Sequence, residues 1–155
     1  MAGKGTPAIV AAERAGIPFV VHEYLHDPKA ASYGAEAAEK LGLDPARVFK
    51  TLVADVDGTL TVAIVPVEAQ LDLKALGKRV SLADAKLAER TTGYVTGGIS
   101  PLGQRKLLPT VLDESALALE TIHVSAGRRG LEIELAPRDL LALTGGRALS
   151  IATRR

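Results

Sequence analysis

The segment VFKTLVADVDGTLTVAIVPV at 48–67 places two runs rich in β-branched residues on either side of Asp57-Gly58. An Asp-Gly pair favours the two-residue turn that joins antiparallel strands, because both positions tolerate the positive φ angles that this turn needs. The segment therefore predicts a β-hairpin. A second hairpin is predicted from TIHVS at 121–125 and LEIEL at 131–135, which are joined by a short segment with two glycines.

Helices are predicted around these hairpins. Thr6-Pro7 is suited to begin a helix that runs to Arg14, because threonine caps and proline fits the first turn. The segment FVVHEY at 19–24 predicts a strand. The other predicted helices cover 32–41, 71–77, 82–90 and 137–143. Helices mixed with antiparallel arms predict an α+β fold around a mixed, strongly curved sheet.

Length and composition limit the classes of protein. A chain of 155 residues, 47% of them apolar, predicts one domain over 1–155. The absence of cysteine excludes disulfides, thiolate metal sites and a cysteine nucleophile, and it favours a cytoplasmic location. The apolar runs are far shorter than the roughly 20 residues of a membrane span, so no membrane partner is expected. A net charge of +1 predicts that contact with nucleic acid is local or assisted by another protein.

The segment HEYLH at 22–26 matches the H-E-x-x-H zinc pattern. That chemistry needs a helix, so that both histidines lie on one face one turn apart. Here an apolar strand pattern precedes the segment, and extended backbone would separate His22 from His26 by about 13 Å. The motif is therefore interpreted as strand, with structural histidines and no metal.

The segment DVDGT at 55–59 resembles the nucleophile motif of haloacid-dehalogenase-like phosphatases. That activity needs further carboxylates that hold magnesium, and the later acidic cluster is missing. The alternating TLTVAIVPV that follows matches a returning strand, so a hairpin turn explains both flanks.

The segment TGYVTGGISPLGQRK at 92–106 is rich in glycine and ends on two cations. Glycine lets another molecule approach the backbone N–H groups, so the loop is a candidate cradle for an anion or a carbonyl; a tight turn is the alternative. Lys50 lies in an apolar strand pattern between Phe49 and Leu52. It is either an edge residue whose stem covers apolar surface or a cation directed into a pocket.

Together these segments closely resemble the YbaK/EbsC family of trans-acting cysteinyl-tRNA(Pro) deacylases, relatives of the editing domain of bacterial prolyl-tRNA synthetases. The resemblance runs through nearly the whole chain, and the GGISP segment at 97–101 with an upstream lysine is its most specific part. The other matching segments are HEYLHDP at 22–28, Tyr33-Gly34, LGLDPARVFKTLV at 41–53, PVEAQLDLKALGK at 66–78, TIHVSAGRRGLEIEL at 121–135 and DLLALTGG at 139–146.

The resemblance implies a mixed sheet partly closed into a barrel, hydrolysis of the ester that joins cysteine to tRNA(Pro), no metal or other cofactor, and cooperation with prolyl-tRNA synthetase. It also carries over a set of site residues. The candidate catalytic residues are Lys50, Gly98, Ile99 and Ser100. The candidate substrate-binding residues are Tyr24, Tyr33, Thr51, Gly97, Pro101, Ser125, Gly127, Arg128 and Glu132. Glu132 departs from the family, in which an aspartate is usual at this position.

An aminoacyl ester is already activated, so donors placed at its carbonyl oxygen suffice to accelerate hydrolysis. The backbone N–H groups of Gly98 to Ser100 are the predicted donors, Pro101 stiffens the loop, and Lys50 holds the ester or the terminal phosphate. The thiol of the substrate is a candidate nucleophile. Two alternatives stay open: a module that binds an aminoacyl-adenosine end without cutting it, and a deacylase that prefers another small amino acid such as alanine.

Overall fold

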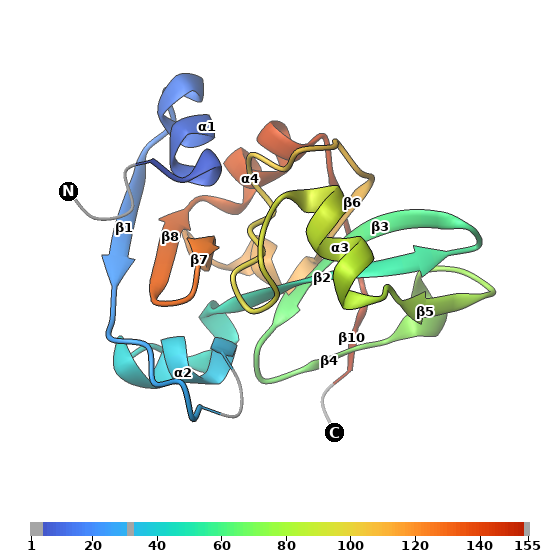
Figure 1. Ribbon diagram of the computed structural model, residues 1–155, viewed down its shortest axis with the longest axis horizontal. Helices are drawn as coiled ribbons and strands as arrows, with labels where there is room; N and C mark the ends of the chain where they lie inside the picture. Colours follow the sequence, from blue (N-terminus) through green and yellow to red (C-terminus); the bar gives the residue numbers. More distant parts are fainter. Residues whose placement is uncertain (1–4, 31–32, 154–155) are drawn as a thin grey trace.

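The computed structural model describes residues 5–30 and 33–153 and shows four helices among three small sheets (Figure 1). The helices are α1 (Pro7–Ala15), α2 (Tyr33–Lys40), α3 (Ala85–Thr92) and α4 (Pro137–Thr144), with 3₁₀ turns at Pro45–Arg47, Leu73–Ala75 and Glu114–Ala118. The strands are β1 (Phe19–Glu23), β2 (Phe49–Val56), β3 (Thr59–Pro66), β4 (Gln70–Leu71), β5 (Val80–Leu82), β6 (Thr110–Asp113), β7 (Ile122–Arg128), β8 (Leu131–Leu135), β9 (Arg147–Leu149) and β10 (Ala152–Thr153).

The first predicted hairpin is confirmed as β2 and β3, which pair antiparallel from Phe49 opposite Pro66 to Val56 opposite Thr59. Asp57 and Gly58 turn the chain with φ angles of 50° and 93°. The hairpin lies in the middle of a five-stranded sheet of order β5-β2-β3-β6-β9, in which β3 pairs parallel with β6. The two-stranded sheet β10-β4 is separate from it.

The second predicted hairpin is confirmed as β7 and β8, which together with β1 form a sheet of order β1-β8-β7. A bulge between Ser125 and Arg128 lies just before its tip. An isolated parallel bridge between Val48 and His123 connects this hairpin to the beginning of β2. The sheets are not closed into a barrel, so that part of the predicted fold is not supported.

Two predicted helices are wrong in their extent. Within 71–77 only Leu73–Ala75 forms a 3₁₀ turn, because Leu71 pairs with Ala152 in the β4–β10 sheet. Within 82–90, Leu82 pairs with Ala54 in β5, and α3 begins only after Asp84. The Asp84 side chain caps that helix by accepting from the Leu87 N–H at 3.3 Å. Strand pairing with distant segments therefore overrides the helical pattern at both positions.

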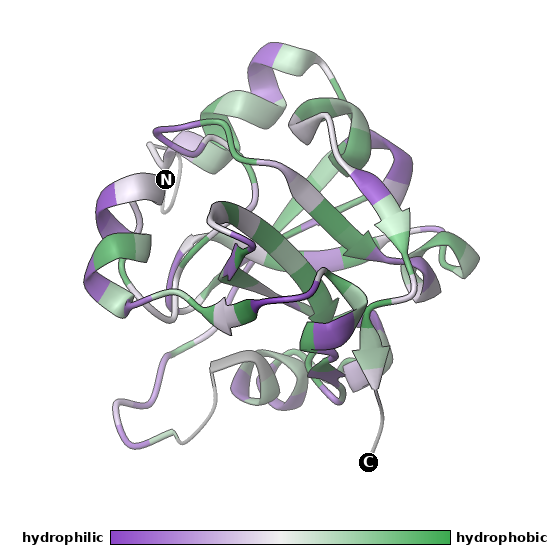
Figure 2. Cartoon of the chain, turned by 90° about the vertical axis from the view of Figure 1, so that its right-hand side faces the viewer, coloured by the Kyte–Doolittle hydropathy of each residue, from purple (hydrophilic) through white to green (hydrophobic). Residues whose placement is uncertain are grey.

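The main core lies where the β1-β8-β7 sheet, the β2–β3 hairpin and helices α1 and α4 meet, and Figure 2 shows apolar residues concentrated on these inner strands. Ile122, Val124 and Ile133 of the second hairpin face this core and are fully buried. Since side chains alternate along a strand, the opposite face of the same sheet carries the polar residues of β7 and β8. None of the helices in the described part of the chain is long and apolar enough to cross a membrane.

Candidate functional site

The two hairpins meet close to the beginning of β2. Val48, just before β2, forms an isolated parallel bridge with His123 of β7. Ser125, two residues further along β7, pairs with Glu132 on β8. Ser125 and Glu132 therefore lie side by side on the outer face of the second hairpin, and Lys50 lies in β2 two residues beyond the bridge to this hairpin.

Burial changes the acid–base properties of this group. Glu132 is 6% exposed, its Oε1 has no hydrogen-bond partner in the described structure, and burial raises its pKa to about 8. The carboxyl group is therefore protonated at neutral pH and able to donate a hydrogen bond. Burial also lowers the pKa of Lys50. Tyr24, whose pKa is raised to about 12 by burial and then by the charge of Glu132, lies close to the same carboxyl group.

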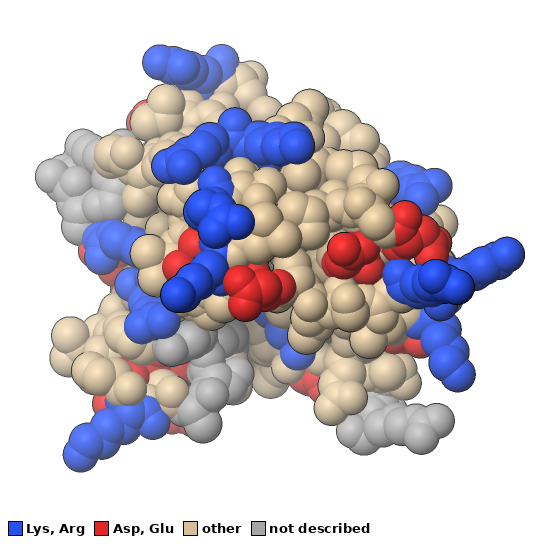
Figure 3. All heavy atoms as spheres, turned by 45° about the vertical axis from the view of Figure 1, so that its right-hand side comes forward, with Lys and Arg blue, Asp and Glu red and all other residues tan. Residues whose placement is uncertain are grey.

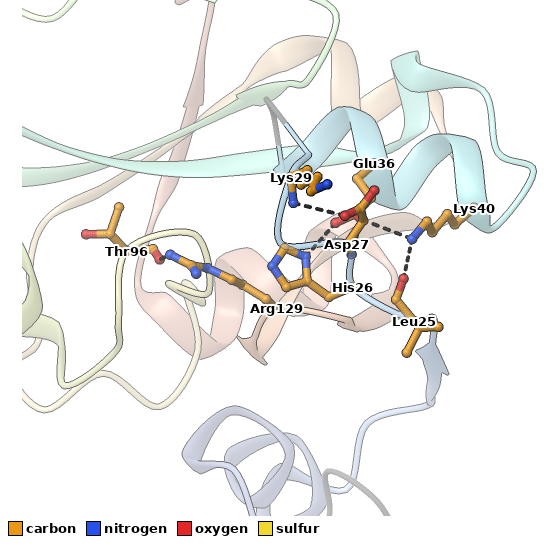
Figure 4. Close-up of polar contacts among 8 residues, drawn as sticks. All are labelled: Leu25, His26, Asp27, Lys29, Glu36, Lys40, Thr96 and Arg129. Atoms are coloured by element: carbon orange, nitrogen blue, oxygen red, sulfur yellow. Dashed lines mark hydrogen bonds and ion pairs between the residues drawn. The ribbon is translucent and has the colours of Figure 1, made fainter.

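The glycine loop contacts the tip of the same hairpin. A Cβ atom added to Gly98 would meet the Cα of Arg128 at 2.7 Å, so only glycine lets the two backbones approach this closely. Gly97 has a φ of 89°, in the left-handed region that also favours glycine. Arg129 Nη2 donates to the carbonyl oxygen of Thr96 at 2.7 Å, which connects the loop to the hairpin a second time (Figure 4).

The backbone donors of the loop differ from the predicted set. The Gly98 N–H donates to the Val95 carbonyl oxygen at 2.8 Å, so it is already engaged in a turn. The N–H groups of Ile99 and Ser100 have no partner within the described residues. Ser100 is fully buried and its Oγ accepts from the Leu102 N–H at 3.2 Å, so its hydroxyl group points into the loop. Pro101 is also buried.

The remaining candidates separate into two groups. Gly127 and Arg128 end β7 at the bulge just before the hairpin tip, and the loop packs against Arg128. Gly127 has a φ of 113°, and Arg128 lies 3.6 Å from Glu23 as a half-exposed ion pair. Thr51 lies on the opposite face of β2 from Lys50, because neighbouring side chains on a strand alternate, so the structure does not bring these two together. Tyr33 begins α2, and its side chain lies outside the described part of the structure.

A buried carboxylate next to this site has no signal in the sequence patterns. Glu36 of α2 accepts from the Asp27 N–H at 2.6 Å, contacts His26 Nδ1 at 2.7 Å and pairs with Lys40 at 3.1 Å (Figure 4). Burial opposes its ionisation, but these three partners outweigh burial and lower the pKa of Glu36 to about 2. The charged Glu36 therefore anchors the segment that follows β1. Tyr24, in the same segment, donates its N–H to the carbonyl oxygen of Gly130 at 3.0 Å.

The HEYLH segment follows its predicted conformation. His22 lies in β1 and contacts Glu134, whereas His26 lies beyond the end of the strand and contacts Glu36. The two histidines thus have different partners. The segment is not helical, and its strand part ends at Glu23, so Tyr24 to His26 do not continue the predicted strand.

Comparisons with known proteins show the family and the fold of this chain. Residues 27–143 match the aminoacyl-tRNA editing domain, and the chain belongs to this family. A relative in Enterococcus faecalis, named "Putative Cys-tRNA(Pro)/Cys-tRNA(Cys) deacylase EbsC", is 40% identical over 96% of this chain and 94% of its own. A crystal structure of a "putative trans-editing enzyme for prolyl tRNA synthetase" superimposes with a TM-score of 0.80 and 25% identity over 95% of each chain. The hypothetical protein APE2540 shares the fold, with a TM-score of 0.84 and 24% identity over 95% of this chain and 99% of its own.

Proposed function

We propose that this chain hydrolyses the ester of misacylated Cys-tRNA(Pro) in trans. Membership of the aminoacyl-tRNA editing family supports deacylation as the class of reaction. The observation that carries the proposal for this chain is that the glycine loop packs on the second hairpin. The loop carries the free N–H groups of Ile99 and Ser100, Ser125 pairs with Glu132 on the outer face of the same hairpin, and the bridge from Val48 to His123 joins this hairpin to the strand that carries Lys50.

The free backbone donors suit the oxygen on which charge develops. Attack on the ester carbonyl places negative charge on its oxygen, and preorganised N–H groups stabilise this charge without reorganising. Ile99 and Ser100 supply two such donors, and Gly98 keeps the loop against the hairpin. Lys50 binds the ester region or the terminal phosphate as a compact cation. Glu132, protonated at neutral pH, donates a hydrogen bond to the substrate.

The substrate supplies the nucleophile in this proposal. The cysteinyl thiol attacks its own ester carbonyl, so a C–S bond forms as the C–O bond to the tRNA breaks. The thiol proton goes to the leaving 3′ oxygen of the tRNA, and water then hydrolyses the cyclic thioester to cysteine. Intramolecular attack of this kind has a high effective concentration, which compensates for the absence of a cysteine in the chain.

Recognition of the tRNA requires help from a partner, and we propose prolyl-tRNA synthetase for this role. Lys and Arg side chains lie in several groups with acidic side chains between them on the face drawn in Figure 3. A net charge of +1 lets the chain neutralise few phosphates. The synthetase would supply the contacts to the rest of the tRNA, while this chain binds its aminoacylated end.

Replacement of Lys50 tests the assigned site. Lys50→Ala removes a charged contact made to the transition state, so we expect about 100-fold slower deacylation of Cys-tRNA(Pro) with normal folding. Lys50→Arg should also fail, because a planar guanidinium does not replace a compact ammonium. Lys74→Ala, at an exposed lysine of a 3₁₀ turn, is the matched control and should retain full activity. Full activity of Lys50→Ala would remove Lys50 from the site.

Release of labelled amino acid from Cys-tRNA(Pro), Ala-tRNA(Pro) and Pro-tRNA(Pro), measured side by side, tests the substrate. We expect the fastest release from Cys-tRNA(Pro), under both single-turnover and multiple-turnover conditions. Faster release of alanine would assign the chain to another small amino acid. Protection of the esters without release would make the chain a binding module and refute the proposal.

A further inference from the structure

A cluster of three metal-ligating side chains lies on the outer face of the β1-β8-β7 sheet. His22 comes from β1, Glu134 from β8 and His123 from β7, so each strand of the sheet contributes one residue. One ligand atom from each of the three lies within 4.8 Å of the other two. His123 pairs directly with Glu134 across the two strands, and His22 reaches Glu134 from the other side.

The contacts within the cluster leave one histidine without a partner. His22 Nε2 lies 2.8 Å from Glu134 Oε1, but His123 Nε2 lies 4.0 Å from Glu134 Oε2, beyond a hydrogen bond. His123 is 1% exposed, and neither of its ring nitrogens has a hydrogen-bond partner among the described residues. A buried imidazole without partners is unfavourable, because its polar atoms have lost water and gained nothing in return. The ring of His22 lies 5.2 Å from that of His123, so the unpartnered side chain is directed at the other ligands.

We propose that His22, His123 and Glu134 bind a zinc ion. Two imidazoles and one carboxylate are a ligand set that zinc accepts, with a fourth position left for water. Bonds of about 2.1 Å in a tetrahedron place ligand atoms roughly 3.4 Å apart. His22 Nε2 lies 2.8 Å from Glu134 Oε1 and His123 Nε2 lies 4.0 Å from Glu134 Oε2, and one ligand atom of each residue lies within 4.8 Å of the other two. Rotation of these side chains would bring the three ligand atoms onto one ion. The ion would give His123 the partner that the protein does not provide.

The ligands are accessible and already oriented. The side chains of His22 and Glu134 are 31% and 23% exposed, so an ion reaches the cluster from solvent. Thr121 Oγ1 donates to Glu134 Oε2 at 2.6 Å and in turn accepts from Arg47 Nη2 at 3.2 Å, which holds the carboxylate in place. Such outer contacts orient metal ligands in proteins. His123 and Glu134 lie two residues along β7 and β8 from Ser125 and Glu132, whereas His22 pairs with Glu132 across β1 and β8, so the cluster borders the proposed ester-binding group.

Titration of the purified chain with Zn²⁺ by calorimetry tests the proposal, and Co²⁺ absorption in the visible range reports the coordination geometry. We expect one zinc ion per wild-type chain. Loss of a residue that only orients a metal ligand weakens metal binding by about 10–100-fold. Removal of a ligand itself, in His22→Gln or His123→Gln, should therefore weaken zinc binding at least about 100-fold. His26→Gln is the matched control, because His26 is the chain's third histidine and contacts Glu36 instead. It should bind zinc as the wild type does.

His123 is buried, so its replacement in His123→Gln can prevent folding. His22 is half exposed, so His22→Gln still tests the site in that case, and circular dichroism checks the folding of each variant. Zinc should also raise the melting temperature of the wild type and of His26→Gln but not that of His22→Gln, since a ligand stabilises the state that binds it. Absence of stoichiometric binding by the wild type would overturn the proposal. Unchanged affinity in His22→Gln, or equal weakening in His26→Gln, would overturn it as well.

Discussion

Replacement of Gly98 by alanine tests whether the loop at 97–101 acts through the position of its backbone. The added methyl carbon would lie 2.7 Å from the Cα of Arg128, and 3.1 Å from both the carbonyl carbon of Arg128 and the nitrogen of Arg129. Unstrained carbon contacts are about 3.5–4.0 Å, so the loop must move away from the hairpin by roughly 1 Å. The contacted atoms are backbone of a paired strand and its turn, which cannot rotate aside as a long side chain would.

This displacement has two measurable costs. Overpacking typically destabilises a protein by about 1–3 kcal/mol, which urea unfolding followed by circular dichroism measures. Movement of the Ile99 and Ser100 N–H groups by about 1 Å should slow deacylation of Cys-tRNA(Pro) by about 100-fold per folded molecule. Lowered stability alone cannot produce that second effect while the chain remains folded.

Leu140→Ala separates the two effects. Leu140 is fully buried in α4, so its truncation costs about 2–5 kcal/mol without adding an atom between the loop and the hairpin. We expect this variant to lose stability and keep its turnover per folded molecule. Normal turnover of folded Gly98→Ala would refute the reasoning and make the loop an ordinary turn.

Three further predictions concern the anchor of the 25–29 segment and the substrate. Glu36→Gln should lower the free energy of unfolding by about 1.5–3 kcal/mol at neutral pH, through loss of charge-assisted hydrogen bonds. The folded-state pKa of Glu36 is about 2, against an ordinary 4.5, so its contribution to the free energy of unfolding is present above pH 4.5 and is lost as the pH falls toward 2. The difference in stability between Glu36→Gln and the wild type should therefore shrink when denaturation is measured at low pH. A difference that stays constant with pH would contradict this assignment. Ser-tRNA(Pro) should be hydrolysed far more slowly than Cys-tRNA(Pro) in a release assay, since oxygen replaces the attacking sulfur; equal rates would favour a positioned water. The isolated chain should discriminate little between Cys-tRNA(Pro) and Cys-tRNA(Cys), and its binding to tRNA should be weak and depend little on salt. Addition of prolyl-tRNA synthetase should increase the discrimination. Strong selection by the chain alone would refute the need for a partner.

Local elements could be predicted from the sequence because their signals act within a few residues. Thr6 accepts from the Ile9 N–H at 3.2 Å and begins α1, and Asp57-Gly58 adopts the positive φ angles that close the first hairpin. Such signals depend on backbone preference and short-range hydrogen bonds, which the residues themselves supply. The resemblance of GGISP at 97–101 likewise located the loop, although it did not show that the Gly98 N–H is already used.

Pairings between distant segments were decided only by the tertiary structure. β6 is four residues long and has no periodicity of its own, yet it pairs with β3 inside the five-stranded sheet. Leu71 lies in a helical pattern and still pairs with Ala152, because the gain from strand pairing exceeds a weak local preference. Such choices depend on which surfaces meet after the chain collapses, and no local window contains that information.

The functional chemistry follows the same division. The sequence selected Lys50 and Glu132 through its resemblance to the editing family, whereas the glycine loop also stood out by its composition. The contact of His22 with Glu134 spans 112 residues, and the burial that raises the pKa of Glu132 to about 8 comes from packed neighbours. Burial and proximity are properties of the assembled fold, so only the tertiary structure determined which candidates meet, which donors remain free and which acid stays protonated.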